Sequence, residues 1–372
     1  QLRMAGGRGA AVRIRRPFLY EDAYAALGRL GDRLKGRVQV TFENEHGMEE
    51  AGIDGGGVFK EFLDALTKRT FDPSYGLFQA NAEGLLSPAP GARLACDHPR
   101  AHFEFAGRVL GKAVLEDILV EPQFANFFLN MLLGKHNQYD DLFSLDPEMY
   151  KHLNSLKDVA AAGEDISALH LTFSVTHSEY GEVRTVNLCP DGDNIPVTNE
   201  NVIRYIHLLA NYKLNVQTAA QGRAFLKGFR DLIPVAWIRL FTPQELQAVI
   251  GGEPRRLDTA DLRRHVHYAG GYHGSQPYIQ AFWEIIDSFT AEEQAAFLKF
   301  VTSCSRQPLL GFQHLHPTFS IQQVPAGEGD ARLPSSGTCM NLLKLPRYAG
   351  GPVTLRQKLL YAIRANAGFE LS

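Results

Sequence analysis

Four cysteines are the residues of this chain best suited to covalent chemistry, because a thiolate is both a nucleophile and a metal ligand. They are Cys96, Cys189, Cys304 and Cys339, and they lie far apart with no CxxC pair among them. This spacing predicts neither a zinc site nor a redox-active pair. Few, scattered cysteines are typical of a reducing compartment, in which each one is a free thiol.

Cys339 differs from the other three in its surroundings. It follows the loop of small residues Pro334-Ser-Ser-Gly-Thr338 and precedes the apolar run MNLLKL, which predicts a strand. A junction of loop and strand presents a side chain to solvent on a fixed backbone. Thr338 and nearby backbone amides could hydrogen-bond a developing thiolate or carbonyl oxygen. On chemistry alone, a nucleophile and a buried structural cysteine remain alternatives.

Histidines offer two further chemistries. A cysteine hydrolase needs a histidine base close to its thiol, and His314 and His316 are the nearest in sequence to Cys339. Their segment HLHP is more typical of a loop. The cluster HVHYAGGYH at 265–273 lacks an HExxH helix or cysteine ligands, so it predicts loop histidines and no metal site.

The bulk composition is that of a globular protein. The 372 residues are 45% hydrophobic and 21% charged, which is enough for two or three cores, and the net charge of −3 gives no general attraction to nucleic acid or anionic membrane. Residues 1–17 carry five arginines and no acid, and we expect a flexible, solvated lead-in there. No run of eighteen apolar residues predicts a membrane span, and no apolar segment near the start predicts a secretory signal. The initial Gln suggests a piece of a longer protein.

Periodicity outlines the elements that must position these residues. VQVTF at 38–42 alternates like a strand, and the glycine turn at 54–57 leads into an amphipathic helix. Two apolar helices separated near Pro122 are expected over 103–133, and a hairpin over 169–188. Further helices are expected at 18–35, 146–157, 201–213, 216–232, 243–250, 258–264, 277–288, 291–300 and 353–365, with strands at FSIQQV and MNLLKL. The polar segment that follows Phe300 resembles a linker, which predicts a large helical body and a small α/β lobe.

Many segments together resemble the catalytic domain of HECT-type ubiquitin-protein ligases. LPSSGTCMNLLKLPRY, which contains Cys339, is similar to the active-site segment of that family. Similar segments follow one another in the family's order along the chain from about Leu19 to Ser372: VTFENEHGMEEAGIDGGGVFKEF, FAGRVLGKAVLEDILVEPQFANFFL, IPVTNENV, FLKGFRDLIP, YAGGYH, FWEII, FLKFVTSCSRQPLLGF and the tail GFELS. The ending and the TSCSR segment are most similar to the branch related to the E6-associated protein, whose members lack WW domains.

The resemblance implies an α+β, bilobal fold. It predicts a basic lead-in at 1–17, a large helical N-lobe at 18–301, a hinge at 302–306 (Ser303, Cys304, Ser305 and Arg306) and a small α/β C-lobe at 307–372 that carries the cysteine. A rotating C-lobe would let Cys339 reach first a donor and then an acceptor, while Arg306 paired with an N-lobe acid would fix the lobe orientation.

The resemblance also implies a ubiquitin-conjugating enzyme as partner. It places the binding groove for that enzyme in a subdomain at about 137–217. The matching positions are apolar residues with i, i+4 or i+7 spacing on two helices, and one further leucine: Met149, Leu153, Leu156, Leu171, Tyr205 and Leu209. Such stripes are also typical of a helix core. An aromatic residue among aliphatic ones suits an interface pocket.

The implied reaction has two steps. Cys339 takes ubiquitin as a thioester from the conjugating enzyme, and a lysine of a protein substrate then takes it as an amide, with proteasomal degradation among the implied outcomes. Phe369 matches the tail phenylalanine that orders the lobes, and Glu370 is a candidate base for the lysine. Many members have histidine two residues before the cysteine; this chain has Gly337, so no histidine role carries over.

No metal and no organic cofactor are implied, and the expected location is the cytoplasm, or also the nucleus. Two other functions remain as alternatives. One is a cysteine hydrolase of the deubiquitinase kind, and the other is a catalytically silent binding module of the ubiquitin pathway. The intact LPSSGTCMN segment and the GFELS tail argue against the silent module.

Overall fold

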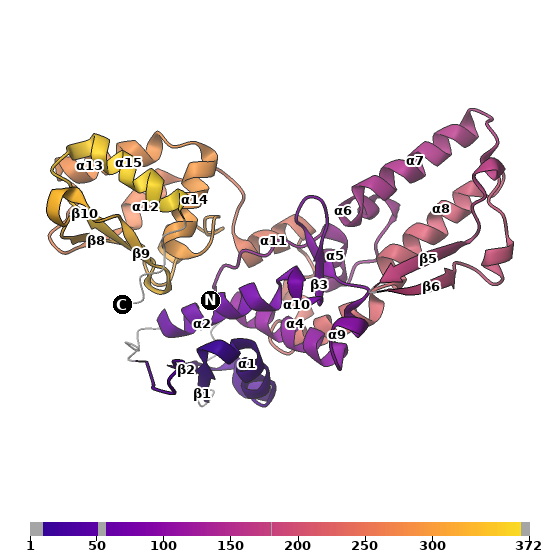
Figure 1. Cartoon of the computed structure of the whole chain (residues 1–372), viewed down its shortest axis with the longest axis horizontal. Coiled ribbons are helices and arrows are strands. Elements are labelled where there is room, and N and C mark those ends of the chain that lie inside the picture. The colour runs from indigo at the N-terminus through magenta and orange to yellow at the C-terminus, as the bar shows by residue number, and fades with distance from the viewer. Residues whose placement is uncertain (1–9, 51–56, 180, 366–372) are drawn as a thin grey trace. The chain divides into compact units, whose positions relative to one another are not determined.

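The computed structural model describes residues 10–50, 57–179 and 181–365, which form an α+β fold as predicted (Figure 1). The helices are α1 Leu19–Gly28, α2 Gly57–Thr70, α3 Ala92–Ala95, α4 Pro99–Leu115, α5 Asn126–Leu133, α6 Leu142–Leu145, α7 Pro147–Ala161, α8 Val202–Asn211, α9 Ala219–Arg230, α10 Val235–Ile238, α11 Pro243–Gly251, α12 Thr259–His265, α13 Pro277–Asp287, α14 Ala291–Thr302 and α15 Gly351–Arg364. The strands are β1 Ala10–Arg15, β2 Val38–Glu43, β3 Phe78–Ala80, β4 Leu86–Pro88, β5 Ser174–Glu179, β6 Glu182–Asn187, β7 His267–Ala269, β8 Ser320–Val324, β9 Ser335–Gly337 and β10 Leu342–Pro346. Short 3₁₀ turns join several of them, including one at Thr338–Met340.

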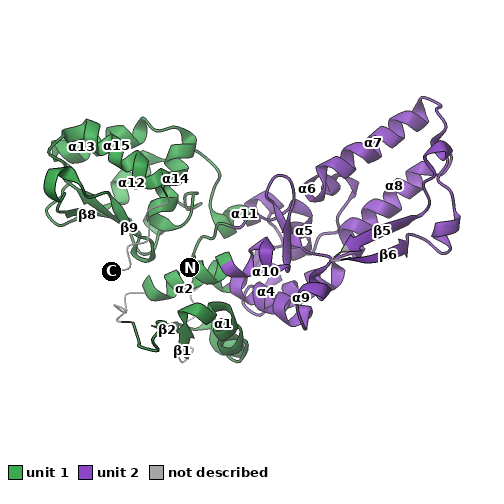
Figure 2. Cartoon of the chain, in the orientation of Figure 1, with its two compact units in different colours: residues 1–68, 112–121, 247–372 green, residues 69–111, 122–246 purple. Residues whose placement is uncertain are grey.

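The chain forms two compact units, each built from segments that are not adjacent in sequence (Figure 2). Unit 1 contains residues 1–68, 112–121 and 247–372, and unit 2 contains residues 69–111 and 122–246. Cys339 therefore lies in unit 1, and the segment predicted to bind a conjugating enzyme lies in unit 2.

A four-stranded sheet organises the part of unit 1 that carries Cys339. Its strand order is β7-β8-β10-β9; β8 pairs in parallel with both β7 and β10, and β9 is antiparallel to β10. Helices α12 to α15 gather around this sheet (Figure 1). One apolar core joins sheet and helices, with Trp283, Ile321, Leu343 and Leu359 fully buried within it.

This core corrects the predicted lobe boundary. It runs from Leu257 to Ile363, so helices α12, α13 and α14, which we assigned to the N-lobe, share a core with the residues of the predicted C-lobe. The predicted hinge at 302–306 thus lies inside one core rather than between two. The change to polar residues after Phe300 corresponds to the end of α14, where Ser303 has a left-handed φ of 69°.

The structure also corrects the flexible lead-in, for residues 10–17. Residues Ala10–Arg15 form strand β1, which pairs in parallel with β2 from Ala10↔Val38 to Arg15↔Glu43. Its apolar side chains alternate inward, and Ile14 is fully buried. Arg16 forms a salt bridge with Glu50 at 2.6 Å and with Glu61 of α2 at 2.8 Å. The arginines of this segment are therefore partners of carboxylates on neighbouring elements.

Unit 2 has its core between α4, α5 and α9. Two glycines let the backbones of α4 and α9 touch, because a Cβ on Gly107 would lie 2.0 Å from the Phe225 carbonyl oxygen, and one on Gly228 would lie 1.8 Å from that of Glu104. Six phenylalanines pack edge to face beside this crossing: Phe71, Phe78, Phe103, Phe124, Phe128 and Phe225.

Helices α7 and α8 and the hairpin β5–β6 also belong to unit 2 (Figure 1). The side chain of Asp146 accepts a hydrogen bond from the Met149 N–H at 2.9 Å, and Pro147 occupies the first turn of α7. This arrangement satisfies an N–H that has no partner within the helix. No helix in the described ranges is both long enough and apolar enough to pass through a bilayer.

Candidate active site around Cys339

Cys339 lies at the tip of the connection between β9 and β10. The antiparallel pairs Leu342↔Gly337 and Lys344↔Ser335 bring the two strands together, and the 3₁₀ turn Thr338–Met340 joins them. Asn341 closes the turn with a left-handed φ of 48°, a conformation that asparagine tolerates better than most residues. The thiol is half-buried, so it keeps access to solvent. Since β10 pairs on both of its edges, the backbone next to Cys339 is held in place.

Helix α2 packs against this turn within unit 1. A Cβ placed on Gly57 would lie 2.7 Å from Met340 Sδ and 3.4 Å from the Cys339 carbonyl oxygen, so only glycine fits there without movement. One turn further along α2, Lys60 donates hydrogen bonds to the carbonyl oxygen of Thr338 at 3.0 Å and to the side chain of Asn341. The turn that carries Cys339 therefore rests on the first turns of α2.

The electrostatic surroundings of the thiol are mixed. Burial raises the pKa of Cys339 above its ordinary value, and the Glu61 carboxylate adds to that rise. Lys60 and the backbone N–H groups of Cys339 and Met340 act in the opposite direction and lower the pKa. Because the net shift is upward, the resting thiol is mostly protonated at neutral pH. Any change that weakens Glu61 or strengthens the positive groups will increase the thiolate fraction.

The other cysteines have less suitable positions. Cys304 is buried, and burial raises its pKa to about 12, with Glu121 adding to the rise; its thiol donates to the Gly251 carbonyl at 3.4 Å. Cys96 is half-buried, and burial followed by Asp97 raises its pKa. Cys189 is half-buried after the hairpin β5–β6. Of the four, only Cys339 lies on a tight turn between paired strands with a buried ammonium bound to that turn.

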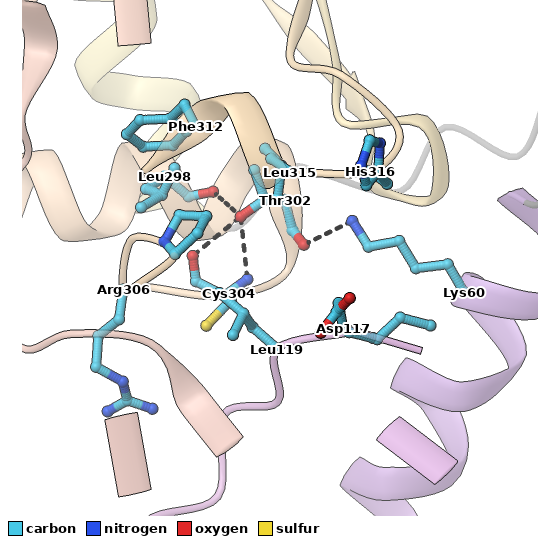
Figure 3. A pocket seen from close by; sticks show the side chains of 12 residues that line it. Lys60, Asp117, Leu119, Leu298, Thr302, Cys304, Arg306, Phe312, Leu315 and His316 are labelled. Atoms are coloured by element: carbon cyan, nitrogen blue, oxygen red, sulfur yellow. Dashed lines mark hydrogen bonds between the residues drawn. The ribbon is translucent and has the colours of Figure 1, made fainter. Parts of the chain in front are cut away.

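A pocket in unit 1 lies near the site but does not include Cys339 in its lining (Figure 3). Thr302 and Cys304 line it from the end of α14, and Lys60 reaches it from α2, donating to the Thr302 carbonyl oxygen at 3.3 Å (Figure 3). Thr302 Oγ1 bonds the carbonyl oxygens of Leu298 and Cys304. The pocket is thus lined by groups that already hydrogen-bond one another. No group of three or more potential metal ligands occurs within residues 10–50, 57–179 and 181–365.

Comparison with known proteins identifies the family. The HECT-domain (ubiquitin-transferase) family matches residues 64–372, most of the chain and the part that holds Cys339. The chain belongs to this family. It is 49% identical over 364 residues to E3 ubiquitin-protein ligase UPL6 of Arabidopsis thaliana, covering 97% of this chain and 35% of that protein. It is 45% identical to human ubiquitin-protein ligase E3B (97% of this chain, 36% of that protein) and 39% identical to E3 ubiquitin-protein ligase HUL5 of Saccharomyces cerevisiae (99% and 40%).

The chain spans little more than a third of the length of these relatives. The family match covers residues 64–372 of this chain and does not extend to the remainder of such longer proteins. The more specific placement in the branch related to the E6-associated protein stays a prediction.

Six residues of the HECT domain were predicted to line a groove for the conjugating enzyme, and the structure divides them. Leu153, Tyr205 and Leu209 are buried between α7, α8 and Phe173, whose ring meets that of Tyr205 edge to face at 5.6 Å. Met149, Leu156 and Leu171 keep part of their surface exposed. In the same unit, Phe143, Leu169 and Ile203 expose about half of their surface or more: 45%, 53% and 50%. The binding role of the groove stays a prediction.

The predicted hinge residues make specific contacts within unit 1. The Ser305 N–H donates to the Glu121 carboxylate. Arg306 donates to the Gly251 carbonyl at 2.7 Å and to the Glu121 carbonyl at 3.0 Å, and its charge also acts on the Glu121 carboxylate; that this contact fixes the lobe orientation stays a prediction. Burial opposes ionisation of Glu121, yet the Ser305 N–H, Lys299 and Arg306 together lower its pKa. Phe369 and Glu370 lie outside the described residues.

The sequence reasoning did not single out Lys60, Glu61 or Arg16. Lys60 carried a detectable signal, because it shares a helix face with Gly57, Leu63 and Thr67, at i−3, i+3 and i+7. Those three residues are buried, so a lysine among them marks a charge that needs a specific partner. Arg16 and Glu61 are far apart in sequence, and only the tertiary structure brings them together.

Proposed function

We propose that this HECT domain takes ubiquitin from a ubiquitin-conjugating enzyme onto Cys339 as a thioester and passes it to a lysine of a protein substrate. What supports the proposal most directly is the position of Cys339: a half-buried thiol on a strand-anchored turn, within the part of the chain that matches a ubiquitin-transferase family. The relatives named above are ubiquitin-protein ligases by name.

The chemistry follows from thiol exchange. The Cys339 thiolate attacks the carbonyl carbon of ubiquitin's C-terminal residue, a new sulfur–carbon bond forms, and the sulfur of the conjugating enzyme leaves as a thiolate. One thioester replaces another, so this step is close to balanced in free energy. The substrate amine then attacks the same carbon, Cys339 leaves as a thiolate, and the amide bond makes the second step favourable. A base must take the proton of the amine, a role for which Glu370 remains our candidate.

We also propose that the conjugating enzyme docks on residues 137–217 of unit 2. The partly exposed Met149, Leu156 and Leu171, together with the exposed Phe143, Leu169 and Ile203, supply the apolar surface that such a partner needs. The buried Leu153, Tyr205 and Leu209 would then support that surface from behind. The cysteines are free thiols, which suits a reducing compartment, and we propose the cytoplasm, or also the nucleus, as the location.

The test is reconstitution of the first step. The chain is incubated with activating enzyme, ubiquitin and a panel of conjugating enzymes, and the products are run on non-reducing gels. We expect an adduct on Cys339 that a reducing thiol removes. Cys339→Ser should give an adduct that resists reducing thiol, Cys339→Ala none, and Cys189→Ser, the matched control, a normal one. Leu156→Asp should weaken formation of the adduct with an otherwise active conjugating enzyme.

The same experiment separates the alternatives. A cysteine hydrolase would release ubiquitin from a conjugate and would lose that activity in His314→Ala. In the described part of the chain, the groups that act on the Cys339 thiol are Glu61, Lys60 and backbone amides, with no histidine among them. A silent binding module would bind the conjugating enzyme without forming any adduct. Normal conjugation by Cys339→Ala would disprove the proposed function.

A further inference from the structure

Lys60 is a charged side chain buried in unit 1 at the base of the turn that carries Cys339. It is 7% exposed, although a lysine is rarely buried without a partner. Its ammonium meets the carbonyl oxygens of Thr338 at 3.0 Å and Thr302 at 3.3 Å, and the side-chain oxygen of Asn341. Figure 3 shows the side chain extending from α2 toward Thr302. An ammonium has three N–H donors, so three acceptors use all of them.

Two of these acceptors belong to the two ends of the cysteine turn. Thr338 directly precedes Cys339, and its carbonyl oxygen also accepts the Asn341 N–H at 3.3 Å, which closes the turn. Asn341 is fully buried, and its side-chain N–H donates to the Pro317 carbonyl at 2.5 Å. One ammonium therefore ties the residue before Cys339 to the residue that ends the turn, and both to α2. Without Lys60, the buried side-chain oxygen of Asn341 and the part-buried carbonyl oxygen of Thr338 would each lose a donor.

The charge of Lys60 also acts on the thiol. Burial lowers the pKa of Lys60 to about 8, against the influence of Asp64, Cys304 and Cys339, so the ammonium is still mostly protonated at pH 7. Lys60 in turn lowers the pKa of Cys339, against burial and Glu61. Other charged or titratable groups line the pocket that Lys60 reaches: Asp117, Arg306 and His316. A buried charge interacts more strongly than an exposed one, since less water screens it.

We propose that Lys60 is a positioning residue for Cys339, which holds the 338–341 turn on α2 and keeps a positive charge beside the thiolate. The inference rests on the proposed thioester function and adds to it a residue outside the cysteine segment. Lys60 forms no covalent bond and transfers no proton in this role. It favours the ionised thiol, and it fixes the direction from which the sulfur approaches a donor thioester.

Three replacements separate its two contributions. Lys60→Met removes both the hydrogen bonds and the charge, Lys60→Gln keeps N–H donors without the charge, and Lys60→Arg keeps both. Lys35→Met is the matched control, because Lys35 is an exposed lysine of the same unit that pairs with Asp32 at 2.8 Å. Thermal unfolding followed by circular dichroism establishes which variants are folded, and Lys60→Gln serves where Lys60→Met does not fold.

The first measurement needs no ubiquitin. Iodoacetamide alkylates thiolates, so the rate of Cys339 alkylation against pH, followed by peptide mass spectrometry, reports the pKa of the thiol. We expect Lys60→Met and Lys60→Gln to react about fivefold more slowly than wild type at pH 7.5, as a loss of one nearby charge raises a thiol pKa. The difference from wild type should shrink above about pH 8, where Lys60 itself loses its charge in the wild-type chain. Lys60→Arg should restore most of the rate, and Lys35→Met should match wild type.

The second measurement is single-turnover transfer of ubiquitin from a charged conjugating enzyme. We expect Lys60→Met to lower the maximal rate of transfer about tenfold while the concentration of conjugating enzyme at half-maximal rate stays unchanged, because Lys60 lies outside the proposed docking surface. Lys60→Gln should fall between Lys60→Met and wild type. A merely structural lysine would not shift the pH profile of alkylation in a folded variant.

The outcomes keep the two proposals apart. Absence of a thioester in wild type would overturn the proposed function, while the alkylation profile would still decide the role of Lys60. A normal thioester together with wild-type alkylation in folded Lys60→Met or Lys60→Gln would overturn the role of Lys60 alone. A folded Lys60→Arg variant that behaves like Lys60→Met would also overturn it.

Discussion

The contact between α4 and α9 depends on glycine, and Gly228→Ala is expected to destabilise unit 2. A Cβ at Gly228 would lie 1.8 Å from the carbonyl oxygen of Glu104, and 3.1 Å from the Arg108 backbone nitrogen. Ordinary van der Waals contact of a Cβ begins near 3.4 Å. The opposing atoms belong to a helix backbone, which cannot turn aside as a flexible side chain can. The two helices must therefore separate at this point by roughly 1.5 Å.

The magnitude follows from two opposing effects. Overpacking of a rigid contact costs about 1–3 kcal/mol, and here the whole displacement falls on backbone, so the upper part of that range applies. Alanine gains up to about 1 kcal/mol over glycine in a helix interior, which offsets part of the cost. The net loss of stability in unit 2 is then about 2 kcal/mol. Phe71, Phe78 and Phe225 pack beside the crossing and will share the displacement.

Native-state hydrogen exchange measures this loss where it occurs. Amides of α4 and α9 should exchange about 30-fold faster in Gly228→Ala than in wild type, since every 1.4 kcal/mol corresponds to a factor of ten. Gly28→Ala in α1 is the matched control, because no atom lies within 4 Å of a Cβ built there; it should leave stability unchanged or slightly higher. Unchanged exchange in α4 and α9 of Gly228→Ala would refute the argument that their backbones touch.

Two further predictions concern unit 1. Thr290 and Glu293 form a reciprocal cap at the start of α14, so Thr290→Ala should lower the stability of that helix by about 1 kcal/mol. This loss is measured as faster amide exchange in the first turns of α14, and Thr290→Ser should retain most of the stability. Equal loss in both variants would show that the hydroxyl does not act as a cap. Cys304, whose burial raises its pKa to about 12, should remain unalkylated by iodoacetamide at pH 8 in the native chain while Cys339 reacts, and both should react alike in urea; prompt native modification of Cys304 would contradict its burial.

Local pattern predicted most of the long elements. The apolar spacing of Val58, Phe59, Phe62 and Leu63 predicted α2, and the alternation of VQVTF predicted β2. Both patterns place the apolar side chains on one face of the element, which the fold then buries. Strands of three residues, such as β3, β7 and β9, have too few residues for a period. Strand β1 was not predicted, because its arginines make the segment look polar and obscure the alternation of Ala10, Val12 and Ile14.

The lobe boundary shows a different kind of limit. The polar residues after Phe300 correctly predicted the end of a helix there, since α14 ends at Thr302. The division between cores depends on which helix and strand faces pack together, and local sequence does not show this. Phe297 of α14 packs against Phe319, which lies beyond the break, with ring centroids 6.1 Å apart. The active-site segment could be identified from the residues that flank Cys339 in the sequence. Its partners on α2 lie nearly 280 residues away, so only the fold reveals them.

The pairing of β1 with β2 has a practical consequence for anyone who shortens this domain. A fragment that begins at Phe18 would leave Val38, Val40 and Phe42 without the strand beside them, and the exposed edge would invite association between copies. It would also remove Arg16, the cation that engages Glu61. The Glu61 carboxylate raises the pKa of the Cys339 thiol. Removing the strand at the start of the domain would therefore leave Glu61 without this cation and would raise the pKa of the reactive thiol further.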